Sequence, residues 1–592
     1  MARELLKDLI YGEQLVSDGC KVDFAVGLTY SLNLETMLTV PLAFGDLGEL
    51  DDNVKKNPAF LLEGIRRSGD KIALFCNKGS IQVPDEVRTV FSLLEESIFE
   101  VKNDTKTLSN FHPKLWLVKE TDQDGVEWLN LSVMSRNLEY STCLDICCSL
   151  RGKIGKRRSR NDSDLHKPLK DMLIWVSNYA TKSKANKVVE LAELLDYVDH
   201  FDLDEPFDVE GDGYEFFPFV FGKDEFNKYN EPLNNLLRGE RILVISPFID
   251  VETLSRLTGE KTNKPSKQAI LITRYEYVTQ EVLDLFDEVW VANDTMIDNT
   301  TAQVDLHAKM YLTQRYSGEN TGYTLYLGSA NATKNAFNKN AEFLLALHYK
   351  RTTIDQIKTL LDEIVSDNRF TKIDSPNPNA TNERPKNDEE LLLKKAADCL
   401  KEATIDDDGN GFYKVTLSVK GSFDNSIKIR PLQCKDFWKP ISQEVTFENL
   451  SLFLLSDFYV LRIATEAKAI DMVVKVETKR MPKDRDNAII QSVVTKKEEL
   501  LDYVAFMLSD APTEYLFEQQ IQNDRNLGAG FSSKQVSTLP LYEQLLKTAS
   551  KNPQQIAEIQ AFVNKVKQDI VPDELKQILD KFKNVSKQIA AL

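Results

Sequence analysis

The chain has 592 residues, of which 42% are hydrophobic, which is typical of three or four domains with hydrophobic cores and excludes a disordered protein. Its formal net charge of −18 excludes a protein that coats nucleic acid through its overall charge, although a local basic groove is compatible with it. The seven cysteines include no Cys-x-x-Cys pair, so their spacing indicates no zinc site.

The N-terminal segment gives no targeting signal. "MARELLKDLIYGEQL" has the pattern of an amphipathic helix rather than a basic segment followed by an apolar run. No apolar stretch approaches the roughly 20 residues that are needed to span a bilayer. We therefore expect a cytoplasmic protein with reduced cysteines and no membrane partner.

The first part of the chain alternates strand and helix patterns. Strands are predicted at 21–31 and 71–81, with a helix at 57–69 between them. Residues 111–120 and 127–135 are predicted to pair around the turn signal "TDQDG". A basic, Gly-containing loop, "RGKIGKRRSR", follows these strands.

The alternation begins again after a helical stretch, in "RILVISPFID", "KQAILITRYE", "DEVWVAND", "LHAKMYL" and "YTLYLGSAN". Alternating strands and helices favour an α/β layered fold. A segment rich in Pro, Asn and charge then has the composition of a linker. The predicted units are a first half at 1–160, a helical connector at 161–234, a second half at 235–372, the linker at 373–390, a strand-rich C-terminal domain at 391–510 and a helical tail at 511–592.

One short pattern occurs twice. In "VDLHAKMYL", at 304–312, a strand would place His307 and Lys309 on one face, roughly 7 Å apart. "NFHPKLWLV" places His112 and Lys114 in the same relation in the first half. Two of the five histidines of the chain therefore occupy equivalent places.

Each His-x-Lys pair is followed by further matching residues. The first copy continues with Ser135 and Asn137, the second with Ser329 and Asn331. The two His-to-Asn spacings are 25 and 24 positions. Each copy then has an acid that opens or adjoins an apolar strand, and the two acids are Asp145 and Glu342.

This duplicated pattern resembles the phospholipase D superfamily, over about residues 20–350 apart from the connector. The resemblance implies an α/β fold of two phospholipase D-like repeats related by a pseudo-twofold axis, each with mixed sheets flanked by helices. The later strands and helices would form a C-terminal α+β extension. It also implies one shared active site, in which His112 and Lys114 face His307 and Lys309.

The chemistry implied by the resemblance is phosphodiester cleavage without a metal or other cofactor. Two Lys and two Asn would hold the phosphate oxygens, one neutral His would attack phosphorus, and the other would protonate the leaving oxygen. Asp145 and Glu342 are the acids that would orient the imidazoles. By analogy with the tyrosyl-DNA phosphodiesterases, His112 is the expected nucleophile.

The sequence departs from the family pattern in three ways. An Asp five residues after each Lys is replaced by Lys119 and Gln314, as also happens in the tyrosyl-DNA phosphodiesterases, which favours that branch or related nucleases over lipases. Met134 precedes the first Ser-x-Asn, whereas Gly328 precedes the second. Pro113 lies inside the first His-x-Lys, where we expect a break in the strand ladder or a sheet edge.

Other candidates have two interpretations. Ser135 and Ser329 can donate hydroxyls to the substrate, or they can simply form turns. Lys156, Arg157 and Arg158 in the basic loop can track phosphates of a polyanion, or they can form a solvated loop. The remaining histidines have no matching partners, and we expect them to be structural: His166, His200 and His348.

The leading hypothesis is a metal-independent phosphodiesterase that cleaves nucleic acid, with DNA favoured. The alternatives are an enzyme that acts on phospholipid and a regulatory or scaffold subunit, although two intact His-x-Lys pairs argue against lost catalysis. Chains with this kind of nuclease half often carry an added C-terminal region and act with an ATPase or helicase partner in defence against foreign DNA. Such a partner, or a homo-oligomer formed through the C-terminal region, is therefore an expectation here.

Overall fold

The computed structural model describes most of the chain. Of the helix predicted at 57–69, only Leu62, Ile65 and Gly69 are among the described residues. Arg160 of the basic loop and residues 511–544 of the predicted tail lie outside them. The described residues are 15–17, 19–44, 62, 65, 69–103, 109–139, 143–159, 165–203, 213–219, 232–259, 268–292, 305–316, 321–366, 369–381, 388–424, 426–465, 469–508, 545 and 553–589.

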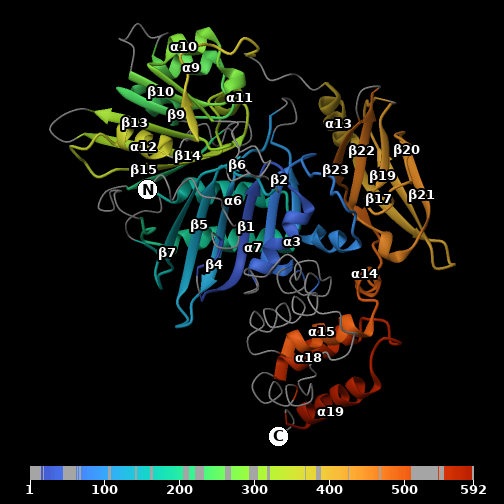
Figure 1. Cartoon of the computed structure of the whole chain (residues 1–592). Helices are drawn as coiled ribbons and strands as arrows, with labels where there is room; N and C mark the ends of the chain where they lie inside the picture. Colours follow the sequence, from blue (N-terminus) through green and yellow to red (C-terminus); the bar gives the residue numbers. More distant parts are fainter. Residues whose placement is uncertain are drawn as a thin grey trace, which may run out of the picture.

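The first half is built on a six-stranded sheet in the order β3-β2-β1-β4-β5-β7. Its strands are near-continuous apolar runs, because the sheet is covered on both faces. The helix α3 (Leu34–Phe44) follows β1 and lies on one side of the sheet (Figure 1). The strands are β1 (Lys21–Thr29), β2 (Ile72–Asn77), β3 (Ile98–Val101), β4 (Leu115–Thr121), β5 (Glu127–Met134) and β7 (Cys147–Lys153).

The second half is built on an eight-stranded sheet in the order β16-β11-β10-β9-β13-β14-β15-β8. Its strands are β8 (Tyr214–Phe219), β9 (Arg241–Ile245), β10 (Gln268–Thr273), β11 (Glu288–Ala292), β13 (Met310–Tyr316), β14 (Gly322–Gly328), β15 (Glu342–His348) and β16 (Phe370–Lys372). Its helices are α8 (Pro232–Arg238), α9 (Val251–Thr258), α10 (Gln280–Leu285), α11 (Lys334–Asn338) and α12 (Gln356–Val365).

The two sheets repeat one topology. In each sheet, three parallel strands are followed by three strands that pair antiparallel. The parallel strands β1, β2 and β3 correspond to β9, β10 and β11. The antiparallel strands β4, β5 and β7 correspond to β13, β14 and β15. The match extends to side chains, because Asn33 caps α3 and Asp250 caps α9, each by accepting a backbone N–H of the first turn. The predicted fold of two repeats with mixed sheets and flanking helices is confirmed.

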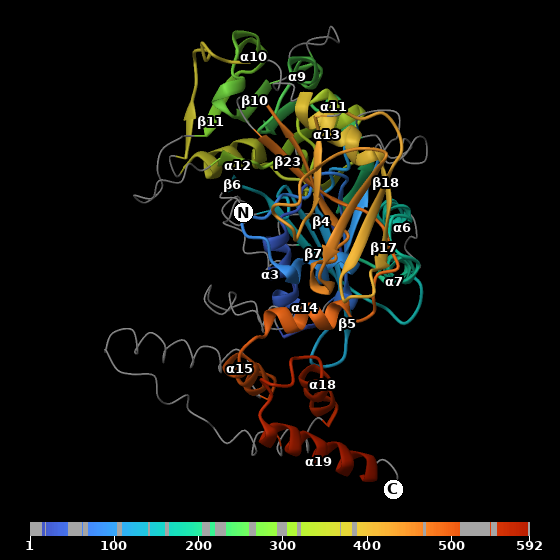
Figure 2. The same cartoon turned by 90° about the vertical axis from the view of Figure 1, so that its right-hand side faces the viewer.

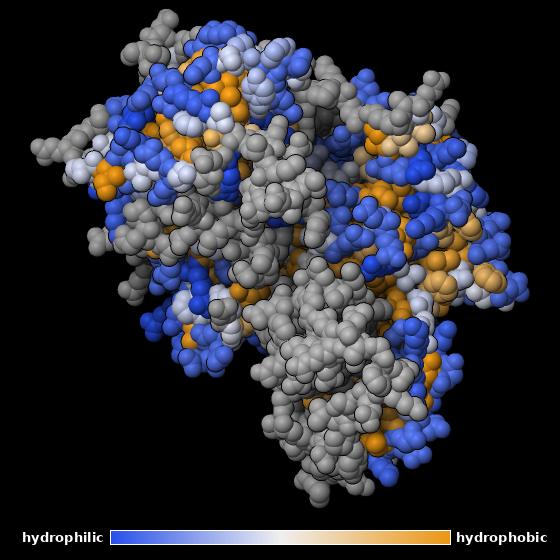
Figure 3. Space-filling view, in the orientation of Figure 1, coloured by the Kyte–Doolittle hydropathy of each residue, from blue (hydrophilic) through white to orange (hydrophobic). Residues whose placement is uncertain are grey.

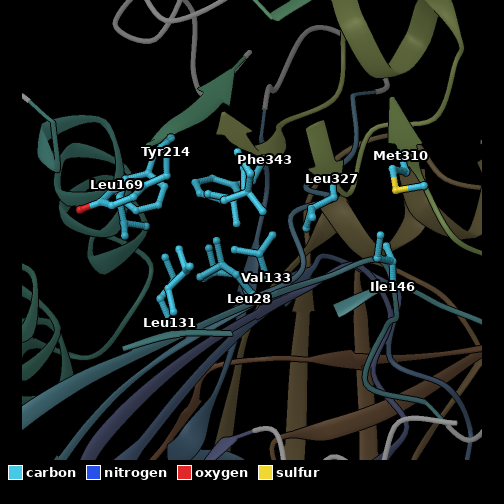
Figure 4. Packing of buried hydrophobic residues seen from close by; sticks show 14 of the residues in the cluster. Leu28, Leu131, Val133, Ile146, Leu169, Tyr214, Met310, Leu327 and Phe343 are labelled. Atoms are coloured by element: carbon cyan, nitrogen blue, oxygen red, sulfur yellow. The ribbon is translucent and has the colours of Figure 1, made fainter. Parts of the chain in front are cut away.

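The two halves share one hydrophobic core. Leu131 and Val133 of β5 lie opposite Leu327 and Phe343 of the second half, and the side chains meet between the sheets (Figure 4). Helices α6 (Lys167–Ser177) and α7 (Lys182–Leu194) of the connector pack on the same core. The segment predicted as a helical connector also contains β8, which pairs with β15 and so extends the second sheet.

The C-terminal region contains two four-stranded sheets that share a core. One sheet has the order β21-β18-β17-β24 and the other β20-β19-β22-β23. The strands are β17 (Leu400–Asp407), β18 (Tyr413–Val419), β19 (Lys428–Pro431), β20 (Lys439–Pro440), β21 (Glu444–Leu450), β22 (Phe458–Ala464), β23 (Ala469–Lys475) and β24 (Thr478–Lys479). We call these two sheets the sandwich. The helices are α13 (Asp388–Cys399), α14 (Arg485–Val493), α15 (Lys497–Leu508), α18 (Pro553–Val563) and α19 (Asp573–Ile589).

The sandwich and the last helices pack against the outer face of the first half. Phe458 and Val473 of the sandwich belong to the same buried cluster as Leu74 of β2 and Ile559 of α18. In the space-filling view, apolar side chains appear along the sandwich and down to the C-terminal helices, among mainly hydrophilic surface (Figure 3). Among the described residues, no helix is both long and apolar enough to cross a bilayer.

The first part of the predicted linker is bound to the second half. Residues 373–381 run along the second half, where Ile373 N donates to Val289 O at 2.8 Å and Asn377 N donates to Val278 O at 2.9 Å. The next described residue, Asp388, opens α13 of the C-terminal region.

Candidate active site

Both His-x-Lys segments leave the strand ladder. In the first half, β4 begins at Leu115, so His112 and Lys114 lie before it, and the break expected at Pro113 is confirmed. In the second half, the single strand predicted over 304–312 is wrong. The short β12 (Asp305–Leu306) ends before His307, and β13 begins only at Met310.

Backbone contacts between the halves explain these breaks. His307 N donates to Leu144 O at 2.9 Å, and β12 pairs in parallel with β6 (Cys143–Leu144) of the first half. In the reciprocal contact, His112 N donates to Ala341 O at 2.8 Å. Each histidine is therefore fixed to the residue just before the acid of the other half.

Each acid consequently contacts the histidine of the other half. His112 Nδ1 lies 2.8 Å from Glu342 Oε2, and His307 Nδ1 lies 2.9 Å from Asp145 Oδ1. Both carboxylates are buried, whereas the imidazoles keep 14% and 18% of their side-chain surface exposed. With Nδ1 directed to an acid, Nε2 is the nitrogen that each ring has left for another partner.

The two serines position these acids. Ser135 Oγ donates to Asp145 Oδ1 at 2.9 Å and accepts the Ile146 N–H at 2.9 Å. Ser329 Oγ makes the same pair of contacts with Glu342 and Phe343 N. Both serines are fully buried, and their hydroxyls hold the two carboxylates. A direct contact of either hydroxyl with the substrate, which is one of the two interpretations of the sequence, stays a prediction.

Two lysine ammonium groups lie in the buried interior of the site. Lys114 Nζ is 3.1 Å from His112 Nε2, and it donates to His112 O at 3.0 Å. Lys309 Nζ likewise donates to His307 O. Burial lowers the pKa of Lys114 to about 8, and burial together with the charge of Lys114 holds the pKa of Lys309 well below its usual range. Two like charges held together out of water favour binding of an anion between them.

The same electrostatics act on the acids and on His307. Burial raises the pKa of Glu342 to about 8, against the charge of Lys114. Burial opposes ionisation of Asp145, but the His307 hydrogen bond and the charges of His307 and Lys309 hold its pKa below the usual value. Burial and the charge of Lys309 lower the pKa of His307 to about 4 despite Asp145. His307 is therefore neutral at pH 7 while the site holds no anion.

The two asparagines follow the ends of equivalent strands. Leu138 N donates to Thr29 Oγ1 at 3.0 Å, and Ala332 N donates to Ser246 Oγ at 2.9 Å, so the loops that carry Asn137 and Asn331 are fixed in the same way. Asn137 Nδ2 donates to Glu139 Oε1 at 2.9 Å. Within the described ranges, no group of three or more His, Cys, Asp or Glu side chains is arranged to hold a metal ion.

Comparison with solved structures gives matches of low identity and low TM-score. The chain is similar to yeast tyrosyl-DNA phosphodiesterase. The identity is 13%, the match covers 60% of this chain and 89% of that chain, and the TM-score is 0.37. A phosphatidylserine synthase of Haemophilus influenzae Rd KW20 matches at 10% identity over 65% of this chain and 94% of that chain, with a TM-score of 0.33. No family profile matches the sequence, and no curated protein is similar to it in sequence.

Four residues near the site were not predicted from the sequence. The Tyr30 ring lies 5.0 Å from the His112 ring, and Arg274 Nε donates to Leu306 O, next to His307, at 3.2 Å. Glu139 contacts Asn137, and Lys394 of α13 lies over the Tyr30 ring. Tyr30 and Arg274 each directly follow a strand that carries the site, which is the signal that could have identified them.

The basic loop lies at the far end of the first sheet. Strand β7 starts beside Asp145 and runs about 20 Å before the loop begins, at roughly 3.3 Å per residue. Contact of Lys156, Arg157 or Arg158 with a phosphate at the histidines is therefore excluded. Contact with a distant part of a long polyanion stays a prediction.

Proposed function

We propose that the chain is a phosphodiesterase that cleaves nucleic acid in two steps through a phosphohistidine, without a divalent metal. The observation that supports this most is the crossed arrangement of two His–acid pairs around two buried lysines. Each half supplies one histidine and the acid for the other, so neither half carries a complete catalytic unit.

The first step requires a neutral nucleophile. Lys114 Nζ donates toward His112 Nε2, which is possible only when Nε2 carries no proton, and Nδ1–H then donates to Glu342. His112 Nε2 attacks phosphorus while the bond to the leaving oxygen breaks, and protonated His307 donates its Nε2 proton to that oxygen. Lys114, Lys309 and the two asparagines bind the non-bridging oxygens.

The second step releases the enzyme. His307, now neutral, removes a proton from water, the resulting hydroxide attacks phosphorus, and the bond to His112 Nε2 breaks. The first step needs a protonated His307, whose pKa in the free protein is about 4, so His307 must gain a proton when the substrate binds. A phosphate anion between the lysines offsets their positive potential, which raises the pKa of His307 toward its ordinary range.

Nucleic acid fits the rim of the site better than lipid does. The Arg274 guanidinium stacks over the Phe248 ring, with 4.6 Å to its centroid, beside the His307 side of the site. Tyr30 provides a second aromatic ring on the His112 side. Aromatic rings next to cations are the groups on which proteins bind single-stranded nucleic acid. The defence role and the ATPase or helicase partner rest on the sequence resemblance alone.

The test is hydrolysis of labelled single- and double-stranded DNA, RNA and phospholipid vesicles in excess chelator. We expect cleavage of nucleic acid in chelator, and an acid-quenched adduct on a peptide that contains His112. An adduct on His307 would reverse the roles, and activity only after added magnesium or manganese would contradict the mechanism. Cleavage of vesicle lipids alone would favour the phospholipase alternative, and no activity on any substrate would favour a regulatory subunit.

A further inference from the structure

Helix α13 links the C-terminal region to the active-site edge of the first sheet. It packs on β22 and β23 of the sandwich, to which it belongs in sequence. Figure 2 shows α13 near the sandwich strands β18 and β23. At its end, Asp398 receives Lys102 Nζ at 2.6 Å and lies 3.8 Å from Lys78 Nζ. Lys78 and Lys102 directly follow β2 and β3, so α13 docks at the carboxyl ends of these parallel strands. This is the edge of an α/β sheet where ligands bind.

One side chain of this helix lies close to the catalytic pair. Lys394 Nζ lies over the Tyr30 ring, 6.0 Å from its centroid. The other neighbours of that ring are His112, at 5.0 Å between centroids, and Lys114 Nζ, at 5.8 Å. Tyr30 therefore lies between a lysine of the C-terminal region and the proposed nucleophile.

This feature belongs to one half only. Thr29 Oγ1 donates to Ser31 O at 2.8 Å, and Ser246 Oγ donates to Phe248 O at 2.7 Å, so Tyr30 corresponds in position to Pro247. The catalytic interior is duplicated, but its rim differs on the two sides. A polynucleotide has different groups on the two sides of each phosphate, so an asymmetric rim suits a directional substrate.

A purely structural role explains Lys394 poorly. Its ion pair with Glu390 at 2.9 Å is an i,i+4 contact on one helix, and such pairs stabilise only slightly. Only 23% of the Lys394 side chain is exposed, so most of its length packs against neighbouring side chains and its position is largely fixed. An ammonium group has three donors, and among the described residues the Glu390 carboxylate accepts from one of them.

We propose that Lys394 and Tyr30 bind the nucleotide next to the scissile phosphate on the His112 side. The Lys394 ammonium group contacts the phosphate of that nucleotide, and the Tyr30 ring packs against its sugar or base. The inference rests on the proposed function and makes it more specific. It gives the C-terminal region a direct part in substrate binding, so that three segments of the chain form the site.

The test compares a single-stranded oligonucleotide with a small chromogenic phosphodiester that has no neighbouring nucleotide. Lys394→Ala and Tyr30→Ala should each lower kcat/KM for the oligonucleotide about tenfold or more relative to kcat/KM for the small substrate. Lys394→Arg should recover most of the loss. Lys395→Ala, at an exposed neighbour on the same helix, is the matched control and should leave the ratio unchanged.

Binding gives a second measurement that does not require turnover. The slope of log K against log salt should become shallower by about 0.7 in Lys394→Ala, as expected for one lost contact with a single strand. An unchanged slope with an unchanged ratio would overturn the inference, and so would equal losses on both substrates together with a lower Tm. The wild-type chain could instead cleave neither substrate, while Lys394→Ala still makes the salt dependence of binding shallower. That result would contradict the proposed function and not the role of Lys394 in binding.

Discussion

At each histidine of the candidate site, one ring nitrogen contacts an acid of the other half, which leaves the second nitrogen for the proposed chemistry. His112 and His307 therefore depend equally on the contact between the halves. The two positions differ in their lysine contacts, because Lys114 lies against Nε2 of His112. That difference supports the proposed roles of His112 as nucleophile and His307 as acid.

Loss of either histidine should abolish most turnover. His112→Ala removes the nucleophile and His307→Ala removes the proton donor, so each should lower kcat on a small chromogenic phosphodiester about 10³-fold or more. His200→Ala, in the connector, is a control that should retain activity. Near-normal activity of His112→Ala would contradict the shared site.

Binding of an oxyanion should be accompanied by proton uptake. The pKa of His307 is about 4 in the empty site, and a bound anion raises it, so the complex holds a proton that the free protein lacks near neutral pH. Affinity for tungstate should therefore increase as pH falls from neutral toward 4. Calorimetry in two buffers of different ionisation enthalpy measures the uptake, which should decrease in His307→Asn. Equal uptake in both proteins would assign the proton to another group.

At the scale of the element, the short pairings between halves decide the geometry. β12 on β6, and the bridge between Phe111 and Ala341, draw both His-x-Lys segments out of their sheets. The sequence predicted the histidines, lysines and acids from their repetition. It could not predict which acid serves which histidine, because that depends on how two distant segments pack. For the same reason a continuous strand was predicted around His307, whereas the structure has a strand on each side of it, β12 and β13, with a break between them.

Gly328 should be required for the second copy of this arrangement. Its φ is +148°, and a Cβ added there would lie 2.3 Å from Phe343 O, directly after Glu342. Gly328→Ala should destabilise the protein by about 3 kcal/mol or more and lower activity, because Ser329 and Glu342 must shift.

Gly125→Ala is a matched control for this variant. Gly125 has a φ of +77° and nothing within 4 Å of an added Cβ, so Gly125→Ala should lower the free energy of unfolding by only about 1 kcal/mol. Thermal unfolding and activity measure both variants. Equal effects would mean that backbone conformation, and not the contact with Phe343, matters at position 328.

At the scale of the whole molecule, the C-terminal region is part of the folded body. Its strands and last helices were predicted from their sequence patterns, but their packing against the first half could not be. Val460 of β22 and Ile559 of α18 belong to one buried cluster with residues that lie hundreds of positions earlier in the chain. Truncation after residue 381 should therefore expose an apolar face and give aggregated protein. Sedimentation of the truncated chain tests this. A soluble, monodisperse fragment with basal hydrolysis would instead support a separable interaction module.

One buried ion pair stabilises that junction. Arg485 Nη1 bonds to Glu95 Oε2 with 8% and 3% of the two side chains exposed, and Glu95 also accepts Ser456 Oγ at 2.6 Å and Asp457 N at 2.8 Å. Arg485→Ala would leave a buried carboxylate without its cation, which should cost about 3–5 kcal/mol. Arg480→Ala removes an exposed pair with Asp406 and should cost less than about 1 kcal/mol.

The loss in Arg485→Ala should also depend on pH. Burial, reinforced by Asp457, raises the pKa of Glu95 to about 7, whereas the unfolded chain releases this proton near 4.5. Between those values the folded protein holds a proton that the unfolded chain has lost, so the contribution of Glu95 to stability falls as pH rises. Without Arg485 the folded pKa rises further and the decline extends to higher pH. The difference in Tm between wild type and Arg485→Ala should therefore be larger at pH 8 than at pH 5. A constant difference would mean that Arg485 acts through packing alone.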